Sequence, residues 1–233
     1  LERKFGVLNI KQLDESKMTV RGITPPLPAK AYKKMNNEDW KSSIIKFGDD
    51  YIRDRYNDDF KGGKLEHSRN FEQEVEIEAK KFHPLIVDLF SINNVSIDYL
   101  SSGIEGLIKA KFDVQRVKEL YLKLIKLDLD QFNTIRSIWM MDYFINNQVV
   151  DEQMLEYLCE LAINHPNPEK ANNPDDPLFD SLNSVRGASI QKIIFCSYNI
   201  AFKDKILFTV EKAANDTQNS VKVAILENLP YLN

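Results

Sequence analysis

Hydrophobic residues recur every three or four positions over most of the chain, and the runs are separated by Asn, Gly and Pro residues. This period is typical of amphipathic α-helices. It predicts helices over residues 36–47, 71–90, 97–108, 114–125, 131–146, 152–164, 184–198, 203–214 and 220–229. Residues 1–35 lack the pattern and contain a proline cluster that favours extended backbone. We therefore expect a linker or edge segment with little helix over 1–35, and one helical domain over 36–233.

A four-residue sequence occurs twice in the predicted helical domain. Residues 183–186 (Asn-Ser-Val-Arg) return as residues 219–222 (Asn-Ser-Val-Lys), and the apolar positions that follow keep the same register. The two copies are 36 residues apart. A period of this length is typical of helical repeat arrays, in which each unit is a helix pair that stacks on its neighbours. The predicted fold class is therefore all-α, an α-α superhelix of stacked antiparallel helix pairs. Val185 and Val221 should be buried near the start of the second helix of their repeats.

Residues 131–146 are apolar on several faces of the predicted helix. A helix that is apolar nearly all round is normally buried between neighbours. We therefore expect this segment to form a central helix of the array.

Residues 164–182 differ from the rest of the domain because they are rich in Pro, Asn and Asp. The pattern predicts a long loop, and long loops within compact domains are often functional or disordered. Its prolines restrict the free chain, and its acidic residues favour a basic partner. Its candidate partner-binding residues are Glu169, Lys170, Asp175 and Asp176. An ordinary surface insertion remains the alternative interpretation.

Composition narrows the function classes further. The formal net charge of −4 argues against a broad nucleic-acid-binding face, which is usually basic. The two cysteines, Cys159 and Cys196, lie in apolar helical runs and are expected to be buried reduced thiols. The sequence contains neither a membrane-length apolar run nor a signal peptide, so we expect a cytoplasmic protein. Because it begins at Leu1 rather than Met, we expect a piece of a longer chain.

The chemical motifs that define common active sites are missing from the sequence. His67, His83 and His165 are too far apart for a standard metal-ligand spacing. Gly103 and Gly106 lie within a helical pattern, where close helix packing explains them better than phosphate binding does. No phosphate-binding loop of the G-x-x-x-x-G-K-[ST] type occurs. We therefore expect no catalytic residues, no cofactor and no metal.

The last predicted unit resembles a HEAT repeat. Asp216 lies in the turn between the two helices, and Val221 and Lys222 open the second helix. HEAT repeats place an aspartate in this turn and Val-Arg after it. Arg186 fits that pattern, whereas Lys222 departs from it, which weakens the expectation of a ladder of bidentate ion pairs.

The resemblance extends to the helical C-terminal region of large bacterial STAND-type, NACHT-like ATPases. It rests on residues 183–188, on Asp216, Val221 and the closing residues 229–232, and on two earlier stretches, 35–40 and 62–66 with the helix that follows. Together these cover much of residues 35–232. The resemblance implies a sensing or regulatory arm, often in phage defence, attached to a nucleotide-hydrolysing module. The implied partner is a foreign protein or another domain of the parent chain.

Two other interpretations remain open. Alkylpurine DNA glycosylases of the HEAT-like type are arrays of about this size that use an aspartate and tryptophans on the concave face. Trp139 and Asp142 lie one helical turn apart in this sequence, with Arg136 nearby. The acidic composition argues against this alternative. The broader interpretation is a free-standing protein-protein scaffold, because helical arrays expose long concave surfaces.

Overall fold

The structure, a computed structural model, describes residues 23–49, 51, 61–168 and 176–232. Within these ranges all regular elements are helical, apart from one isolated parallel bridge between Thr24 and Lys61. This confirms the all-α prediction.

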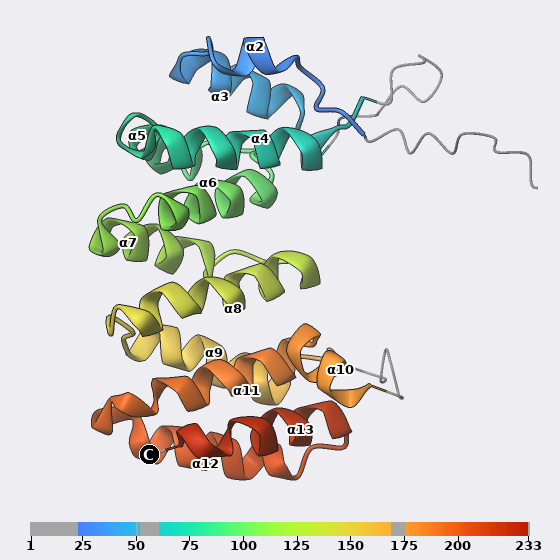
Figure 1. Ribbon diagram of the computed structural model, residues 1–233, viewed down its shortest axis with the longest axis vertical. Coiled ribbons are helices and arrows are strands. Elements are labelled where there is room, and N and C mark those ends of the chain that lie inside the picture. The colour runs from blue at the N-terminus through green and yellow to red at the C-terminus, as the bar shows by residue number, and fades with distance from the viewer. Residues whose placement is uncertain (1–22, 50, 52–60, 169–175, 233) are drawn as a thin grey trace, which may run out of the picture.

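The helices succeed one another along the long axis of the molecule (Figure 1). Their bounds are α2 Ala29–Tyr32, α3 Asn37–Lys46, α4 Lys64–Ile77, α5 Ala79–Leu89, α6 Ile97–Lys109, α7 Val114–Leu124, α8 Gln131–Asn146, α9 Glu152–Asn164, α10 Pro177–Asn183, α11 Val185–Phe195, α12 Lys203–Ala214 and α13 Asn219–Asn228. Single 3-10 turns lie between α11 and α12, at η2 Cys196–Tyr198 and η3 Ile200–Phe202, and after α13, at η4 Leu229–Tyr231.

Five helices form one continuous layer, which we call the α8 layer. Within it α4 packs on α6, α6 on α8, α8 on α11, and α11 on α13, so the layer runs the length of the array (Figure 1). The helices α5, α7, α9 and α12 each pack against the layer helix that follows them in the chain. Each helix pair thus buries its apolar side against its own partner and against the neighbouring pair.

Side-chain caps mark half of the described α-helix starts, namely those of α3, α7, α8, α9, α10 and α11. Asn36 forms a capping box with Asp39 at the start of α3. The carboxylates of Asp113, Asp130 and Asp151 accept backbone N–H groups at the starts of α7, α8 and α9. Such caps satisfy donors that have no partner within the helix. They explain why the predicted bounds of α8 and the start of α9 agree with the structure.

The structure changes the predicted picture in two connecting regions. The run predicted from 71 to 90 is two helices, α4 and α5, separated at Glu78, which has non-helical backbone angles. The predicted loop over 164–182 is shorter than expected, because α10 begins at Pro177. Asp176 caps this helix, and proline at the first helical position has no N–H to lose.

The described part of the N-terminal segment, residues 23–35, packs on the end of the array. Tyr32 is buried, and its ring stacks on that of Trp40 at a centroid distance of 5.4 Å. This part is therefore an edge of the helical domain rather than a free linker, and residues 1–22 lie outside the described residues.

Close contact between α4 and α6 depends on Gly106. A Cβ atom built there would lie 2.7 Å from the backbone oxygen of Glu72 and 2.7 Å from the Cβ of Val75. At Gly103, one turn earlier, the nearest obstacle is the side chain of Ile86, at 3.0 Å. Helix packing thus accounts for both glycines, as the sequence analysis proposed.

His67 lies in the centre of an aromatic cluster at the N-terminal end of the array. It is fully buried, and its ring contacts those of Tyr32, Trp40, Phe47 and Tyr99 at centroid distances of 4.8 to 5.5 Å. Among the described residues neither ring nitrogen finds a hydrogen-bond partner. Burial lowers the pKa of His67 to about 4, so the imidazole is neutral near pH 7.

None of the described helices combines the length and the apolar composition that a membrane crossing requires.

The Gly106→Ala substitution should destabilise the protein, because the added methyl group meets backbone that cannot move alone. We expect a loss of about 1–3 kcal/mol in the free energy of unfolding, measured by urea denaturation. Gly103→Ala is the matched control, since the Ile86 side chain can rotate away and the loss should be smaller. Equal stability of Gly106→Ala and the parent would contradict the close packing of α4 on α6.

Acid should weaken the fold through His67. Its folded pKa of about 4 lies below the ordinary value of 6.5, so the unfolded chain binds a proton that the folded chain does not. The free energy of unfolding should therefore fall as pH drops from about 6.5 to about 4, by up to about 3 kcal/mol. The His67→Leu variant should lose much of this pH dependence in denaturation curves. His83→Gln, at a half-buried position, should change it less.

Candidate functional site

Arg136 of α8 is the centre of a buried polar network within the α8 layer. Its side chain, only 8% exposed at the residue level, donates to both carboxylate oxygens of Glu105, with Nε at 3.1 Å from Oε1. It also donates to the Ser102 hydroxyl at 3.1 Å. Glu105 and Ser102 belong to α6, so these bonds fix α8 against α6.

The same network reaches α4 through Asp98. The Asp98 carboxylate lies 3.7 Å from Arg136, accepts from the Asn133 amide at 3.3 Å, and pairs with Lys64 of α4 at 2.5 Å. A second ion pair, Glu72 with Lys109 at 2.5 Å, also joins α4 to α6, and its hydrogen bond raises the pKa of the lysine. Three neighbouring helices of the layer, α4, α6 and α8, are thus joined to one another by charged side chains.

Two aromatic residues of α8 are exposed beside this network. Phe132 is 54% exposed and Trp139 is 47% exposed, in contrast to the full burial predicted for this helix. The guanidinium carbon of Arg136 lies 5.6 Å from the centre of the Phe132 ring, a cation-π contact. Only one face of α8 departs from the predicted burial, because Ile138, Met141 and Phe144 of the same helix are buried as expected.

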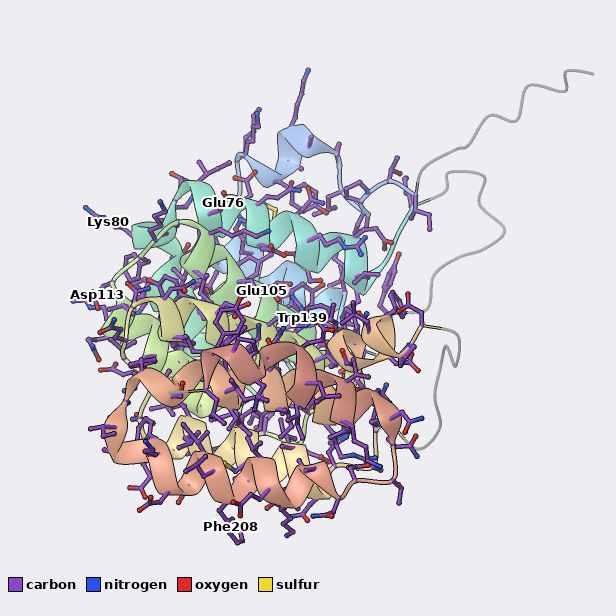
Figure 2. All side chains as sticks on the ribbon, turned by 60° about the horizontal axis from the view of Figure 1, so that its bottom comes forward. Glu76, Lys80, Glu105, Asp113, Trp139 and Phe208 are labelled. Carbon is purple, nitrogen blue, oxygen red and sulfur yellow. The ribbon has the colours of Figure 1, made fainter. Side chains whose placement is uncertain are left out.

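These residues line a shallow groove of about 190 Å³ across α4, α6 and α8, which we call the Trp139 groove. Its walls combine apolar, hydroxyl and charged side chains: Leu65, Ser68, Arg69, Glu72, Ser102, Glu105, Phe132, Arg136 and Trp139. Figure 2 shows Glu105 and Trp139 near each other in the middle of the molecule, well away from Phe208. The groove was not predicted from the sequence, although Phe132, Arg136 and Trp139 share a helical stripe at spacings of four and three residues.

The three residues that a DNA glycosylase would use lie on α8, and two of them, Asp142 and Arg136, are engaged in ion pairs. Asp142 accepts a hydrogen bond from the ammonium group of Lys192 of α11 at 2.7 Å. Arg136 is bound to Glu105. Trp139 alone of the three is both exposed and free of such an ion pair.

Arg186 of the repeated sequence joins three segments. Its guanidinium pairs with Asp216, with Nε and Oδ2 3.0 Å apart, and donates to the carbonyl oxygens of His165 and Pro168, each at 2.9 Å. The Asp216 turn precedes α13, so the contact ties successive units together. Lys222, at the corresponding position of α13, is exposed, and the described residues provide it with no ion pair.

Val185 and Val221 are fully buried at the first turns of α11 and α13. Both helices belong to the α8 layer, and α11 packs directly on α13. The two residues thus have the burial and the position near a helix start that the repeat predicted.

The predicted partner-binding loop is only partly described. Glu169, Lys170 and Asp175 lie outside the described residues. Asp176 is not a free surface charge, because its carboxylate caps α10 by accepting the N–H of Phe179 at 2.9 Å. The start of the loop is held by Arg186, as described above.

A wider depression lies toward the C-terminal ends of α4 and α6. It has a volume of about 930 Å³ and is lined by opposite charges, with Lys80, Lys111 and Arg116 facing Glu76 and Asp113. Figure 2 shows Lys80 and Asp113 at one end of the helices, away from Trp139. This depression lacks a pair of exposed aromatic side chains such as Phe132 and Trp139, which distinguishes it from the Trp139 groove.

The cysteine and histidine side chains pack within the fold and form no candidate catalytic or metal site among the described residues. Cys159 and Cys196 are free, as predicted, and burial raises the pKa of Cys196 to about 12, which keeps this thiol protonated. His83 stacks on Phe112, and His165 accepts the N–H of Asn167. Among the described residues, no three His, Cys, Asp or Glu side chains lie close enough together to hold a metal ion.

Comparisons with protein-family models, with curated proteins and with solved structures gave no match to this chain.

The Arg186→Lys variant should be less stable than the parent, although the charge is kept. A lysine ammonium cannot reach a carboxylate and several carbonyl oxygens as the planar guanidinium does, so buried acceptors lose their donors. We expect a loss of about 1–3 kcal/mol in the free energy of unfolding. Lys222→Arg, at the corresponding exposed position, is the control and should stay within about 0.5 kcal/mol of the parent. A lysine variant as stable as the parent would refute this role of Arg186.

Proposed function

We propose that this chain is a non-catalytic interaction module of HEAT-like helical repeats that binds a protein partner at the Trp139 groove. The single observation that carries the proposal is that Phe132 and Trp139, two exposed aromatic residues of α8, line one and the same groove. Large aromatic residues are enriched where proteins bind one another, because they bury much area at little entropic cost. Solenoid folds present such residues on a rigid continuous surface.

Three features support the HEAT-like part of the proposal. Helix pairs succeed one another along the array, with one helix of each pair in the α8 layer. The repeated sequence opens two helices of that layer, α11 and α13. The ion pair of Arg186 with the Asp216 turn joins adjacent units as a HEAT ladder would.

The resemblance to STAND-type ATPases suggests where such a module works. On that basis we propose a sensing or regulatory arm, whose partner is a foreign protein or the nucleotide-hydrolysing domain of its parent chain. A free-standing scaffold would use the same groove in the same way, so the binding proposal does not depend on the parent.

A HEAT-like DNA glycosylase is the second candidate, and the exposure of Trp139 on the layer that carries Asp142 favours it. Asp142 is half exposed, but its carboxylate is paired with Lys192, a contact that a catalytic aspartate would have to give up in part to act on a sugar. The net charge of −4 also weakens attraction to a phosphate backbone. We therefore rank the interaction module first.

Selection from a random library of displayed short peptides on the immobilised chain tests the proposal. We expect clones that bind the parent and lose binding to Trp139→Ala, because the indole provides much of the buried area. Phe208→Ala is the matched control, since Phe208 is a large exposed aromatic residue on α12, far from the groove. It should bind the same clones as the parent.

Binding of abasic and alkylated duplex DNA, measured at low salt, tests the glycosylase alternative. Saturable binding to damaged DNA that requires Trp139, with no Trp139-dependent peptide, would favour the glycosylase and overturn the interaction module.

A further inference from the structure

The charges that line the Trp139 groove do not balance. Arg136 is neutralised by Glu105, and Glu72 is neutralised by Lys109. Arg69 of α4 also lines the groove, is exposed, and has neither an ion pair nor a side-chain hydrogen bond among the described residues. One unpaired cation therefore remains in a groove whose other charges are satisfied.

The surroundings of Arg69 are largely apolar. Leu65 lies one turn before it on α4, and Phe132 and Trp139 line the same groove from α8. All three are exposed large hydrophobic side chains. A ligand that fills the groove has to cover aromatic and aliphatic surface and to present a negative group to Arg69.

We propose that the Trp139 groove binds a short peptide segment in which an aspartate or glutamate stands close to a large apolar side chain. This inference rests on the proposed function and adds the chemistry of the partner. The apolar side chain packs on Phe132 and Trp139, and the carboxylate pairs with Arg69.

A nucleic acid fits the same groove less well. Binding a phosphate backbone draws on several cations along a track, and the affinity grows with the number of phosphates neutralised. The groove offers a single unpaired cation, with Glu72 and Glu105 beside it. A basic peptide would face Arg69 without gaining a free carboxylate, because both glutamates are already paired.

The two parts of the site have different roles. Arg69 is exposed, and an exposed ion pair contributes little to affinity because water and salt screen it. Like-charge contact is nevertheless unfavourable, so Arg69 selects against the wrong sign of charge. The aromatic residues supply most of the buried area.

Charge reversal tests the inference. Peptides selected on the parent should be enriched in Asp and Glu beside large apolar residues, and a synthetic peptide of the enriched sequence serves as the probe. Its titration is followed by the fluorescence of Trp139, since the other tryptophan, Trp40, is fully buried. Binding should weaken about tenfold in Arg69→Glu. Added salt, which weakens the ion pair in the parent, should partly restore binding to this variant because it screens the like-charge contact.

Lys80→Glu is the matched control, because it changes the net charge equally at an exposed site far from Trp139. It should bind the probe as the parent does. Thermal melting of both variants confirms that the fold is kept, as expected for exposed positions.

Each outcome supports or overturns the proposed function, the further inference, or both. Acidic apolar peptides that need both Trp139 and Arg69 support the inference. Peptides that need Trp139 but show no acidic preference, or bind Arg69→Glu as tightly as the parent, overturn the inference and leave the interaction module standing. If no peptide depends on Trp139, both proposals fail.

Discussion

A buried guanidinium group has to be neutralised, and the neutralisation of Arg136 determines how three helices lie. Its bonds to Glu105 and Ser102 hold α8 against α6, while Asp98 extends the network to Lys64 of α4. Removing one partner from such a group leaves an uncompensated charge in a medium of low polarity, which costs more than the intact pair contributes. The relative position of the three helices is thus coupled to one side chain. The Trp139 groove lies across these helices, so its shape depends on the same network.

The network also explains where the sequence misled us about α8. A helix with Ile, Met, Trp and Phe on several faces predicts burial all round, and its polar residues are then expected to face solvent. The structure reverses part of this pattern, because Asn133 and Arg136 find partners on α6 and turn inward. Phe132 and Trp139 consequently face outward. Which polar residues have a partner depends on the neighbouring helix, and the pattern of a single helix does not contain that information.

Helix starts could be predicted from the sequence more reliably than the burial of individual side chains. The start of α3 at Asn36 was predictable because a polar cap and a following apolar run act over a few residues. The internal repeat likewise predicted the burial of Val185 and Val221. The short helix α10 was not predicted, because a proline within a stretch rich in Asn and Asp usually indicates a loop. In fact Asp176 and Pro177 form a helix start, in which the cap and the fixed proline backbone favour the first turn.

The candidate site was the least predictable part, and the reason lies in how it is assembled. Arg69, Glu105 and Trp139 come from three helices and share no sequence motif. Only the packing of α4 on α6, which the absence of a side chain at Gly106 allows, brings Arg69 toward the residues of α8.

The same assembly has a consequence for binding. Because Arg136 restrains α8 and contacts the Phe132 ring, this ring is held in place before a partner arrives, which lowers the entropic cost of association. Arg69 is exposed and makes no ion pair with any other described residue, so its side chain can adjust to the position of an incoming carboxylate. A rigid apolar wall beside an adjustable cation allows peptides of varied sequence to bind while the sign of their charge is still discriminated.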